Sequence, residues 1–278
     1  MSEISNVSVV VVSYKSEKAL FNLLPSIPSD CELIIVNNAS EILAKGLQEI
    51  RPYIELKQSK NIGFGKACNL GAEAATKEFL FFINPDTILE KNCIENLFEA
   101  YKTKPNAAAI APKILNSKGK ESFKRRSVLL SRKEWLRNPP KVLSEIPIMA
   151  GAAIFIKKEI FIKVGGFDES IFLYHEDDDL SLRLRAEEGP LFYVPNSLIT
   201  HKGGNSTERN EDTAKLKGFH MGWSRVYAMK KHKVQSYKIK CLFLSLIQLI
   251  SIQMIFSRRK RFKYIYFLRG TFLALKEN

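Results

Sequence analysis

One carboxylate stands where a divalent metal ion could bind. Asp86 follows the apolar run Phe79–Ile83, from which Pro85 separates it. An uninterrupted apolar run of this length is typical of a strand buried on both faces of a parallel sheet. Because proline cannot continue a strand ladder, we expect Asp86 just beyond the carboxyl end, where open α/β sheets bind ligands. An oxygen ligand there suits a divalent cation. The alternative is that Asp86 or Thr87 merely caps a helix expected over residues 88–102.

A run of four acids, residues 176–179, opens a second predicted helix. The helix dipole favours carboxylates in a first turn, so a purely structural explanation exists. Four adjacent negative charges nevertheless repel one another, and a carboxylate in a crevice can accept a proton from a hydroxyl nucleophile. His201 follows a predicted strand and could supply a nitrogen ligand to a metal. A single histidine in that position is more often a structural hydrogen-bonding group.

Several motifs of other enzyme classes are excluded. The turn Gly63-Phe64-Gly65 lacks the third glycine of a dinucleotide fingerprint and follows the third predicted strand rather than the first, which excludes a Rossmann dehydrogenase. The sequence contains no phosphate-binding P-loop, no Ser-His-Asp order and no His-Glu-x-x-His helix. The chemistry therefore depends on polar loops rather than on one of these compact motifs.

Those loops follow successive strands. Strands predicted over residues 7–12, 32–36, 54–56 and 79–83 alternate with helices, which indicates a doubly wound parallel sheet with right-handed crossovers. The carboxyl ends of parallel strands meet at one edge, so the loops after them should form a single crevice suited to a nucleotide. The polar loop residues are Ser13-Tyr14, Asn37-Asn38, residues 61–65 and Asp86.

The second half of the chain has a different pattern. A strand is expected over residues 107–112, and residues 116–140 are polar and basic with little periodicity. Such a long irregular stretch is either a lid or binding loop, or a solvated surface loop. Order returns over residues 146–156, followed by helices over 158–164 and from Glu176, and by strands over 191–194 and 198–200.

Composition limits the compartment and the partners. The 278 residues include four widely spaced cysteines, which argues against a zinc site or a disulfide scaffold and favours a reducing compartment. The apolar run at residues 7–12 is too short for a signal peptide, so we expect a cytosolic catalytic part. The net charge is +14, and twelve of the cations lie between Lys230 and the end, with Glu277 as the only acid there. Nucleic acid and an anionic membrane are both compatible with this tail.

The tail also carries an apolar segment. Residues 241–256 are strongly apolar with four polar interruptions, and Arg258-Arg259-Lys260-Arg261 follows shortly after them. Sixteen residues fall short of the roughly 20 that span a bilayer. We therefore expect a helix that lies at the surface of an anionic membrane. The alternative is an amphipathic helix packed on the domain or on another subunit, as in a homodimer. We divide the chain into a domain of residues 1–230 and a tail of 231–278.

Seven short motifs in order resemble a known family. They are Val10-Val11-Val12-Ser13-Tyr14, Ile35-Val36-Asn37-Asn38-Ala39-Ser40, Asn61-Ile62-Gly63-Phe64-Gly65 with Asn69 and Gly71, Asn84-Pro85-Asp86, Gly165-Gly166-Phe167-Asp168-Glu169, Tyr174 and Glu176-Asp177. Together they resemble family 2 glycosyltransferases of the GT-A fold, particularly the rhamnosyltransferase-like branch. The similarity spans about residues 7–206.

The resemblance implies a mostly parallel, Rossmann-like sheet flanked by helices, with a helical basic and apolar extension at the C-terminus. It also implies roles for individual residues. Asp177 would be the general base, with Glu176 beside it; Asp86 and His201 would hold Mg²⁺ or Mn²⁺; Gly151, Ala152 and Tyr174 would lie on the acceptor side. The nucleotide-sugar would be bound by Ser13, Tyr14, Asn37, Asn38, Gly63, Phe64, Asn69, Asn84 and Asp86.

These roles describe an inverting, metal-dependent transfer of a sugar to a hydroxyl of a cell-surface glycan or a polyprenyl-linked acceptor. The family usually has Asp where this chain has Asn37, whose oxygen can still accept the N3–H of uracil or thymine; we therefore expect a UDP- or dTDP-sugar. Lys124, Arg125 and Arg126 could fold over the diphosphate as a lid. A nucleotidyltransferase and a non-enzymatic basic binding module are the alternatives. For the module, basic residues should interleave with aromatics on a folded platform, whereas here they flank an apolar helix, so we expect no nucleic acid.

Overall fold

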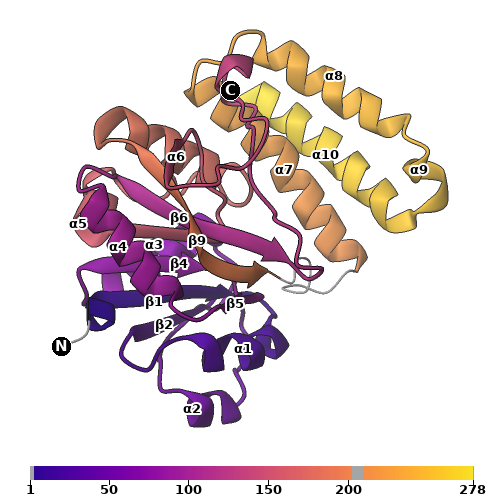
Figure 1. Ribbon diagram of the computed structural model, residues 1–278. Helices are drawn as coiled ribbons and strands as arrows, with labels where there is room; N and C mark the ends of the chain where they lie inside the picture. The colour runs from indigo at the N-terminus through magenta and orange to yellow at the C-terminus, as the bar shows by residue number, and fades with distance from the viewer. Residues whose placement is uncertain (1–2, 202–209, 278) are drawn as a thin grey trace.

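The computed structural model describes residues 3–201 and 210–277, and a central sheet with helices on both faces dominates it (Figure 1). The sheet has nine strands in the order β3-β2-β1-β4-β8-β6-β9-β5, with β7 paired to β9. A separate group of helices, α7 to α10, lies beside the sheet domain at the upper right of Figure 1. The predicted α/β fold, with a sheet flanked by helices and a helical C-terminal extension, is thus confirmed.

The first half of the sheet is parallel. Its elements are β1 (Val7–Ser13), α1 (Glu17–Leu23), β2 (Glu32–Asn37), α2 (Gly46–Ile50), β3 (Ile54–Lys57), α3 (Phe64–Ala74) and β4 (Phe79–Ile83). Strand β1 pairs with β2 on one side and with β4 on the other, both in parallel. The carboxyl ends of these strands therefore lie along one edge, as the sequence predicted.

The second half is mixed. Its elements are β5 (Thr87–Leu89), α4 (Cys93–Thr103), β6 (Ala109–Asn116), β7 (Ser144–Ile146), β8 (Ala153–Lys157), α5 (Lys158–Lys163), α6 (Glu176–Glu187) and β9 (Leu191–His201). Strand β8 runs antiparallel between β4 and β6, while β6 and β9 are parallel to each other.

Both faces of the central strands are buried because their apolar residues do not alternate with polar ones. Val9 and Phe81 belong to a core cluster that includes residues of α1, α2 and α4. Val10 and Phe82 face the other way, into a cluster that includes residues of α3, α5 and α6. Helices therefore cover the sheet on two sides, and its edges alone are left for ligands.

Several predicted boundaries were wrong, and one of them matters for the site. The helix expected over residues 88–102 begins at Cys93, because Thr87–Leu89 forms the short strand β5, which pairs antiparallel with the end of β9. Three residues between a proline turn and a helix carry no periodicity that would reveal a strand. The two strands predicted over 191–194 and 198–200 form the single strand β9.

The C-terminal helices form a unit whose hydrophobic cluster also includes Leu129 and Ile171 of the preceding domain. They are α7 (Glu211–Lys231), α8 (Tyr237–Leu249), α9 (Gln253–Phe256) and α10 (Arg258–Glu277). Helices α7 and α10 approach so closely that a Cβ on Gly222 would meet the carbonyl oxygen of Phe267, and one on Gly270 would meet that of Phe219. By its packing, α7 belongs with this unit; the division at residue 230 stays a prediction.

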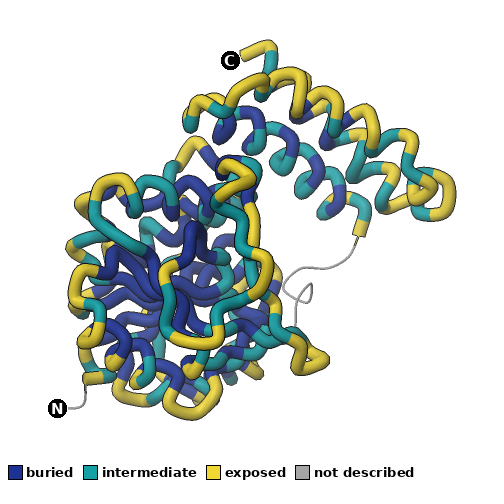
Figure 2. The backbone as a smooth tube through the Cα atoms, turned by 45° about the horizontal axis from the view of Figure 1, so that its top comes forward, coloured by how far each residue is buried: buried dark blue, intermediate teal, exposed yellow. Residues whose placement is uncertain are grey.

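The outer surface of this unit is unusually apolar. Many of its residues are coloured as exposed in Figure 2, and Phe243, Ile250 and Phe256 are 65%, 84% and 81% exposed. Over residues 3–201 and 210–277, the structure has no helix whose length and apolar character would let it cross a membrane.

Candidate active site

A cavity of about 320 Å³ opens at the carboxyl edge of β1, β2 and β4. We call it the carboxyl-edge cavity. Its walls come from the loops after these strands, from the first turn of α6 and from the beginning of α7. It is lined by Val12, Tyr14, Ser16, Asn38, Asn61, Gly63, Phe64, Asn84, Pro85, Gly151, Ala152, Phe172, Leu173, Tyr174, Glu176, Asp177, Thr213, Leu216 and Lys217.

Of the nine residues assigned to the nucleotide-sugar, Tyr14, Asn38, Gly63, Phe64 and Asn84 line this cavity. Asn38 also braces it: the side chain donates to Asn61 Oδ1 (3.0 Å) and accepts the Ile62 N–H (2.9 Å). Gly63 has φ +93°, and a Cβ there would lie 2.7 Å from the Phe172 carbonyl oxygen. Glycine is therefore required where the loop turns against the opposite wall.

Ser13, Asn37 and Asn69 do not line the cavity, and each makes contacts elsewhere. The Ser13 hydroxyl lies 2.9 Å from that of Ser16. The Asn37 amide nitrogen donates to the Glu41 carbonyl (2.8 Å) and to Glu55 Oε1 (2.9 Å). The Asn69 side chain exchanges two 2.9 Å hydrogen bonds with the backbone of Phe167. These three residues support the walls in the structure as it stands, and their ligand contacts stay predictions.

Asp86 and His201 meet, although 115 residues separate them. Strand β5 pairs Thr87 with His201, which brings the imidazole Nε2 to 3.1 Å from Asp86 Oδ1. The Asp86 carboxylate is buried, and its Oδ2 has no hydrogen-bond partner among the described residues. A buried carboxylate oxygen without a partner is costly. An additional ligand at this position would relieve that cost.

Asp177 is held by three donors. Lys124 Nζ and the Gly151 N–H lie 2.7 and 2.8 Å from Oδ2, and the Asp178 N–H lies 2.9 Å from Oδ1. An ionised carboxylate offers about four acceptor positions, so three donors do not fill it. The side chain is 16% exposed and lines the cavity. Asp177 is therefore an oriented carboxylate with capacity for one more donor.

Glu176 differs from its neighbour. It lines the cavity but is nearly buried, and its Oε2 has no hydrogen-bond partner among the described residues. Burial and then the negative charge of Asp177 raise the pKa of Glu176 to about 8. Adjacent carboxyl groups with different environments take different protonation states. Near pH 7, Glu176 is mainly the neutral acid, which can donate a hydrogen bond.

Basic side chains nearby compensate the charges of the other two acids of this turn, Asp178 and Asp179. Burial opposes ionisation of Asp178, but a 2.9 Å contact with His175 Nδ1 and the charge of Lys124 outweigh it and lower the pKa of Asp178. For Asp179, burial is outweighed by His232, Arg183 and Lys231, which lower its pKa to about 2.

The segment of residues 116–140 has little regular structure, as predicted, but it is tied to the domain. Two contacts hold the segment together internally: Arg125 Nη1 donates to the Arg137 carbonyl (3.0 Å), and the Arg126 guanidinium lies over the Trp135 ring. Glu134 lies 3.3 Å from Arg185 of α6. Lys124 pairs with Asp177 in the structure, and a lid of Lys124, Arg125 and Arg126 over a diphosphate stays a prediction.

Gly151, Ala152 and Tyr174, which were assigned to the acceptor side, all line the carboxyl-edge cavity. The Ala152 carbonyl accepts the Asn84 N–H (3.1 Å) and so joins this loop to the one that carries Asp86. Tyr174 precedes α6 with φ +69°, a left-handed conformation that turns the chain sharply into the acidic turn. The acceptor-side and nucleotide-side assignments therefore share one cavity.

Sequence reasoning missed the wall formed by Phe172, Leu173 and the start of α7. Thr213, Leu216 and Lys217 lie about 200 residues after the first strand, and their helix carries no motif of the sheet domain. Sequence reasoning could have included Ser16, because it lies only two residues after the polar pair Ser13-Tyr14.

The geometry can be compared with known proteins. Residues 8–165, more than half of the chain, match the family described as Glycosyl transferase family 2. The chain belongs to glycosyl transferase family 2. This membership favours sugar transfer over the nucleotidyltransferase and the basic binding module considered above.

Named relatives of this glycosyltransferase include sugar transferases of archaea and bacteria. Low-salt glycan biosynthesis hexosyltransferase Agl10 of Haloferax volcanii is 26% identical over 200 residues, covering 66% of this chain and 63% of the relative. N-acetylglucosaminyl-diphospho-decaprenol L-rhamnosyltransferase of Mycobacterium tuberculosis is 26% identical over 245 residues, covering 73% of this chain and 78% of the relative. The predicted similarity to the rhamnosyltransferase-like branch is confirmed.

Solved structures confirm the predicted GT-A type fold. The mannosyltransferase PcManGT of Pyrobaculum calidifontis, in complex with GDP-Man and Mn²⁺, has a TM-score of 0.60 at 13% identity, covering 98% of this chain and 88% of that one. GalNAc-T7 with UDP, GalNAc and Mn²⁺ also has a TM-score of 0.60, at 16% identity over all of this chain and 58% of that one. At these identities the likeness concerns the fold.

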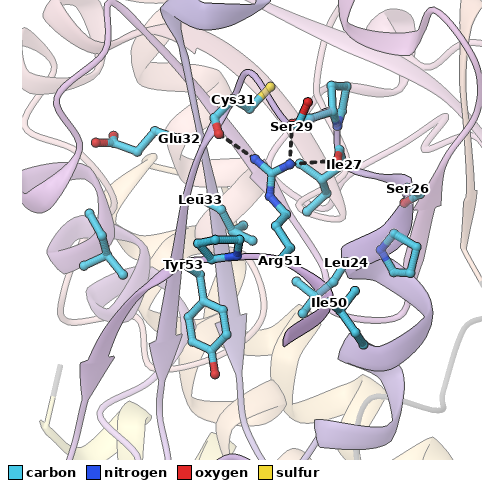
Figure 3. Close-up of a pocket in the computed structure, with 14 residues that line it drawn as sticks. Leu24, Ser26, Ile27, Ser29, Cys31, Glu32, Leu33, Ile50, Arg51 and Tyr53 are labelled. Carbon is cyan, nitrogen blue, oxygen red and sulfur yellow. Dashed lines mark hydrogen bonds between the residues drawn. The ribbon is translucent and has the colours of Figure 1, made fainter. Parts of the chain in front are cut away.

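A larger hollow of about 760 Å³ lies elsewhere in this glycosyltransferase, at the amino ends of β2 and β3 (Figure 3). Arg51 lies within it, and its guanidinium donates to the backbone carbonyls of Ile27, Pro28 and Cys31. The cation therefore fastens the loop after α1. We assign no chemistry to this hollow, because ligands of open α/β sheets bind at the opposite edge.

The raised pKa of Glu176 predicts a pH-dependent stability. An unfolded Glu ionises near 4.5 and folded Glu176 near 8, so the native state retains a proton that the unfolded state loses. Stability from this group is therefore complete below about pH 4.5 and lost as pH rises toward about 8. Gln mimics the neutral acid and cannot ionise. Thermal unfolding should find Glu176→Gln increasingly more stable than the wild type across this window.

Glu187→Gln, the same change at an exposed position of α6, is the control and should show no such trend. A constant difference in melting temperature between Glu176→Gln and the wild type at all pH values would contradict the assignment of a neutral Glu176.

Proposed function

We propose that this glycosyltransferase transfers a sugar from a UDP- or dTDP-sugar, with inversion, to a hydroxyl of a glycan or polyprenyl-linked acceptor at the cytosolic face of a membrane. The observation that carries the proposal is the carboxyl-edge cavity. The oriented carboxylate of Asp177 lines it, and so do Asn84 and Pro85 of the loop that leads to Asp86. A base and a metal-binding carboxylate around one cavity are what a displacement of a diphosphate at a sugar carbon requires.

The donor would lie against Tyr14, Asn38, Gly63 and Phe64, which combine an aromatic surface with amide groups. Asn37 lies behind this wall, at the end of β2. The side-chain oxygen of Asn37 can accept the N3–H of uracil or thymine once the base reaches it. This supports a pyrimidine nucleotide, although a fold neighbour was solved with GDP-Man.

Asp86 and His201 fit a divalent metal. The carboxylate is next to an imidazole, and its buried Oδ2 has no hydrogen-bond partner in the part of the chain that the structure describes, which suits a cation that also binds donor oxygens and water. Among the described residues no cluster of three or more His, Cys, Asp or Glu forms a complete metal cage, so the donor's diphosphate would complete the coordination. Bound there, Mg²⁺ or Mn²⁺ would offset the negative charge of the departing diphosphate.

Asp177 would act as the general base. Its remaining acceptor position takes the proton of the acceptor hydroxyl while that oxygen bonds to the anomeric carbon and the bond to the diphosphate breaks. Attack from the face opposite the leaving group inverts the anomeric centre, as in inverting glycosidases with water replaced by an alcohol. The neutral Glu176 next to it would donate a hydrogen bond to a substrate oxygen and so orient the reactants.

The acceptor class rests on the relatives and on the tail. One relative is named for N-acetylglucosaminyl-diphospho-decaprenol, a polyprenyl-linked sugar. Helix α8 exposes a single apolar stripe that includes Ile239, Phe243 and Leu246, and it continues into Ile250 and Phe256. Exposed cations lie on the same helix and on α10: Lys238 and Lys240 belong to α8, and Arg259, Arg261 and Arg269 belong to α10. Apolar side chains accompanied by cations fit an anionic membrane surface, where such an acceptor is anchored.

The proposed base is tested by Asp177→Asn. With dTDP-rhamnose or a UDP-sugar and N-acetylglucosaminyl-diphospho-polyprenol, transfer should fall by about 10² to 10⁴-fold, the usual contribution of a general base. Donor binding should persist, and NMR of the wild-type product should give the anomer opposite to that of the donor. Asp212→Asn, the same change on the exposed start of α7, is the control. Full transfer by Asp177→Asn, or a retained anomer, would refute the mechanism.

Membrane contact is tested by vesicle flotation. The wild type should float with vesicles that contain anionic lipid, less so with neutral ones and less at high salt, because surface charges are screened. Phe243→Ser with Phe256→Ser should reduce flotation. Ile42→Ser, a change of an 81% exposed isoleucine on the sheet domain, should not. Loss of a homodimer without any loss of flotation would instead favour the subunit interface.

A further inference from the structure

Lys124 makes a contact that the proposed mechanism leaves unused. Its Nζ lies 2.7 Å from Asp177 Oδ2 and 2.8 Å from Asp178 Oδ1, and the side chain is 24% exposed. Burial opposes the charge of this lysine, but Asp177 and Asp178 outweigh it and raise the pKa of Lys124. The ammonium therefore stays charged between the proposed base and the next acid.

The backbone on both sides of Lys124 is fixed. The Ser122 N–H donates to the Ile114 carbonyl of β6 (2.8 Å), and the Phe123 ring packs edge-on against Tyr193 of β9. On the other side the Leu136 N–H donates to the Arg125 carbonyl (3.0 Å). Lys124 thus reaches Asp177 from a rigid base on the sheet rather than from a free loop. A pre-organised cation of this kind can hold a carboxylate in one orientation.

The two oxygens of the Asp177 carboxylate receive different numbers of hydrogen bonds. Oδ2 receives both the Lys124 ammonium and the Gly151 N–H, whereas Oδ1 receives only the N–H of Asp178 among the hydrogen bonds described above. Oδ1 is accordingly the oxygen with capacity for an acceptor hydroxyl. Lys124 also lies between Asp177 and Asp178, where its positive charge offsets the negative charges of both carboxylates.

We propose that Lys124 is the positioning residue of the sugar-transfer reaction: it holds Asp177 ionised and turned so that Oδ1 faces the acceptor. This inference rests on the proposed function, because it assigns to Asp177 the role of base. Lys124 would touch neither the acceptor nor the donor. The other titratable groups around Asp177 are Glu176 and Asp178 of α6, Tyr174 before it, Tyr14 after β1 and Lys217 of α7.

The test replaces the lysine and then restores its charge chemically. The four native cysteines are buried, so a cysteine introduced as Lys124→Cys can be alkylated selectively with 2-bromoethylamine. The thiolate displaces bromide and yields an ammonium on a side chain of nearly lysine length. The readouts are kcat, KM and the pH profile of kcat/KM for sugar transfer to the polyprenyl-linked acceptor.

Lys124→Cys should lower kcat by about 10 to 100-fold through loss of orientation. The acidic limb of the profile should move up by about 1 to 2 pH units, because the cation that favours the charged carboxylate is gone. Aminoethylation should reverse both changes. Lys118→Cys, at an exposed position in the same segment, is the control and should change neither quantity before or after alkylation.

If Lys124→Cys does not fold, Lys124→Gln replaces it, because the amide still donates to the buried Asp178 while the charge is absent. An acidic limb that stays in place in the folded variant, or that does not return on aminoethylation of a folded Lys124→Cys, would overturn the role of Lys124. That failure is distinct from failure of the proposed function, in which the wild type transfers no sugar or Asp177→Asn remains active.

Discussion

Four adjacent carboxyl groups in the first turn of α6 are the constraint on which the site depends. Such a turn is stable only if the charges are removed or compensated, and the structure does so by burying one acid and giving the other three basic or hydrogen-bonding partners. Burial keeps Glu176 mainly neutral, Lys124 and Gly151 hold Asp177, His175 and Lys124 hold Asp178, and Asp179 binds Arg183, Lys231 and His232. The partners come from the irregular segment, from the loop after β7 and from the end of α7. Compensation of charge thereby assembles the walls of the cavity.

The same compensation joins the helical unit to the sheet domain. Lys231, at the end of α7, lies 2.7 Å from Asp179 of α6. Lys217, nearer the beginning of α7, lines the cavity. Helix α7 is in turn packed through glycines against α10. A membrane surface that binds the outer helices would therefore meet a unit that also forms one wall of the proposed active site. This arrangement would bring a membrane-anchored acceptor close to Asp177.

Much of this could be predicted from sequence because local patterns specify it. The β-branched and aromatic strands at residues 7–12, 32–36 and 79–83 have no polar alternation, so a parallel sheet with a ligand edge follows from them. Strand β5 could not be predicted, since its three residues gain their structure only by pairing with β9. The meeting of Asp86 and His201 depends on that pairing, and periodicity cannot reveal it. The partners of Asp177 and the α7 wall likewise depend on contacts between distant segments, whereas the family motifs identified Asp177 itself.

The most direct measurement of the central claim is calorimetric titration of the wild type and of Asp86→Ala with UDP and dTDP, each with and without Mn²⁺. The account predicts that one of these nucleotides binds, that binding requires the metal, and that the Asp86→Ala variant loses at least about tenfold in affinity, or about 1.4 kcal/mol. Binding of neither nucleotide to the folded wild type would contradict the account. Equal binding without metal and in the variant would contradict it as well.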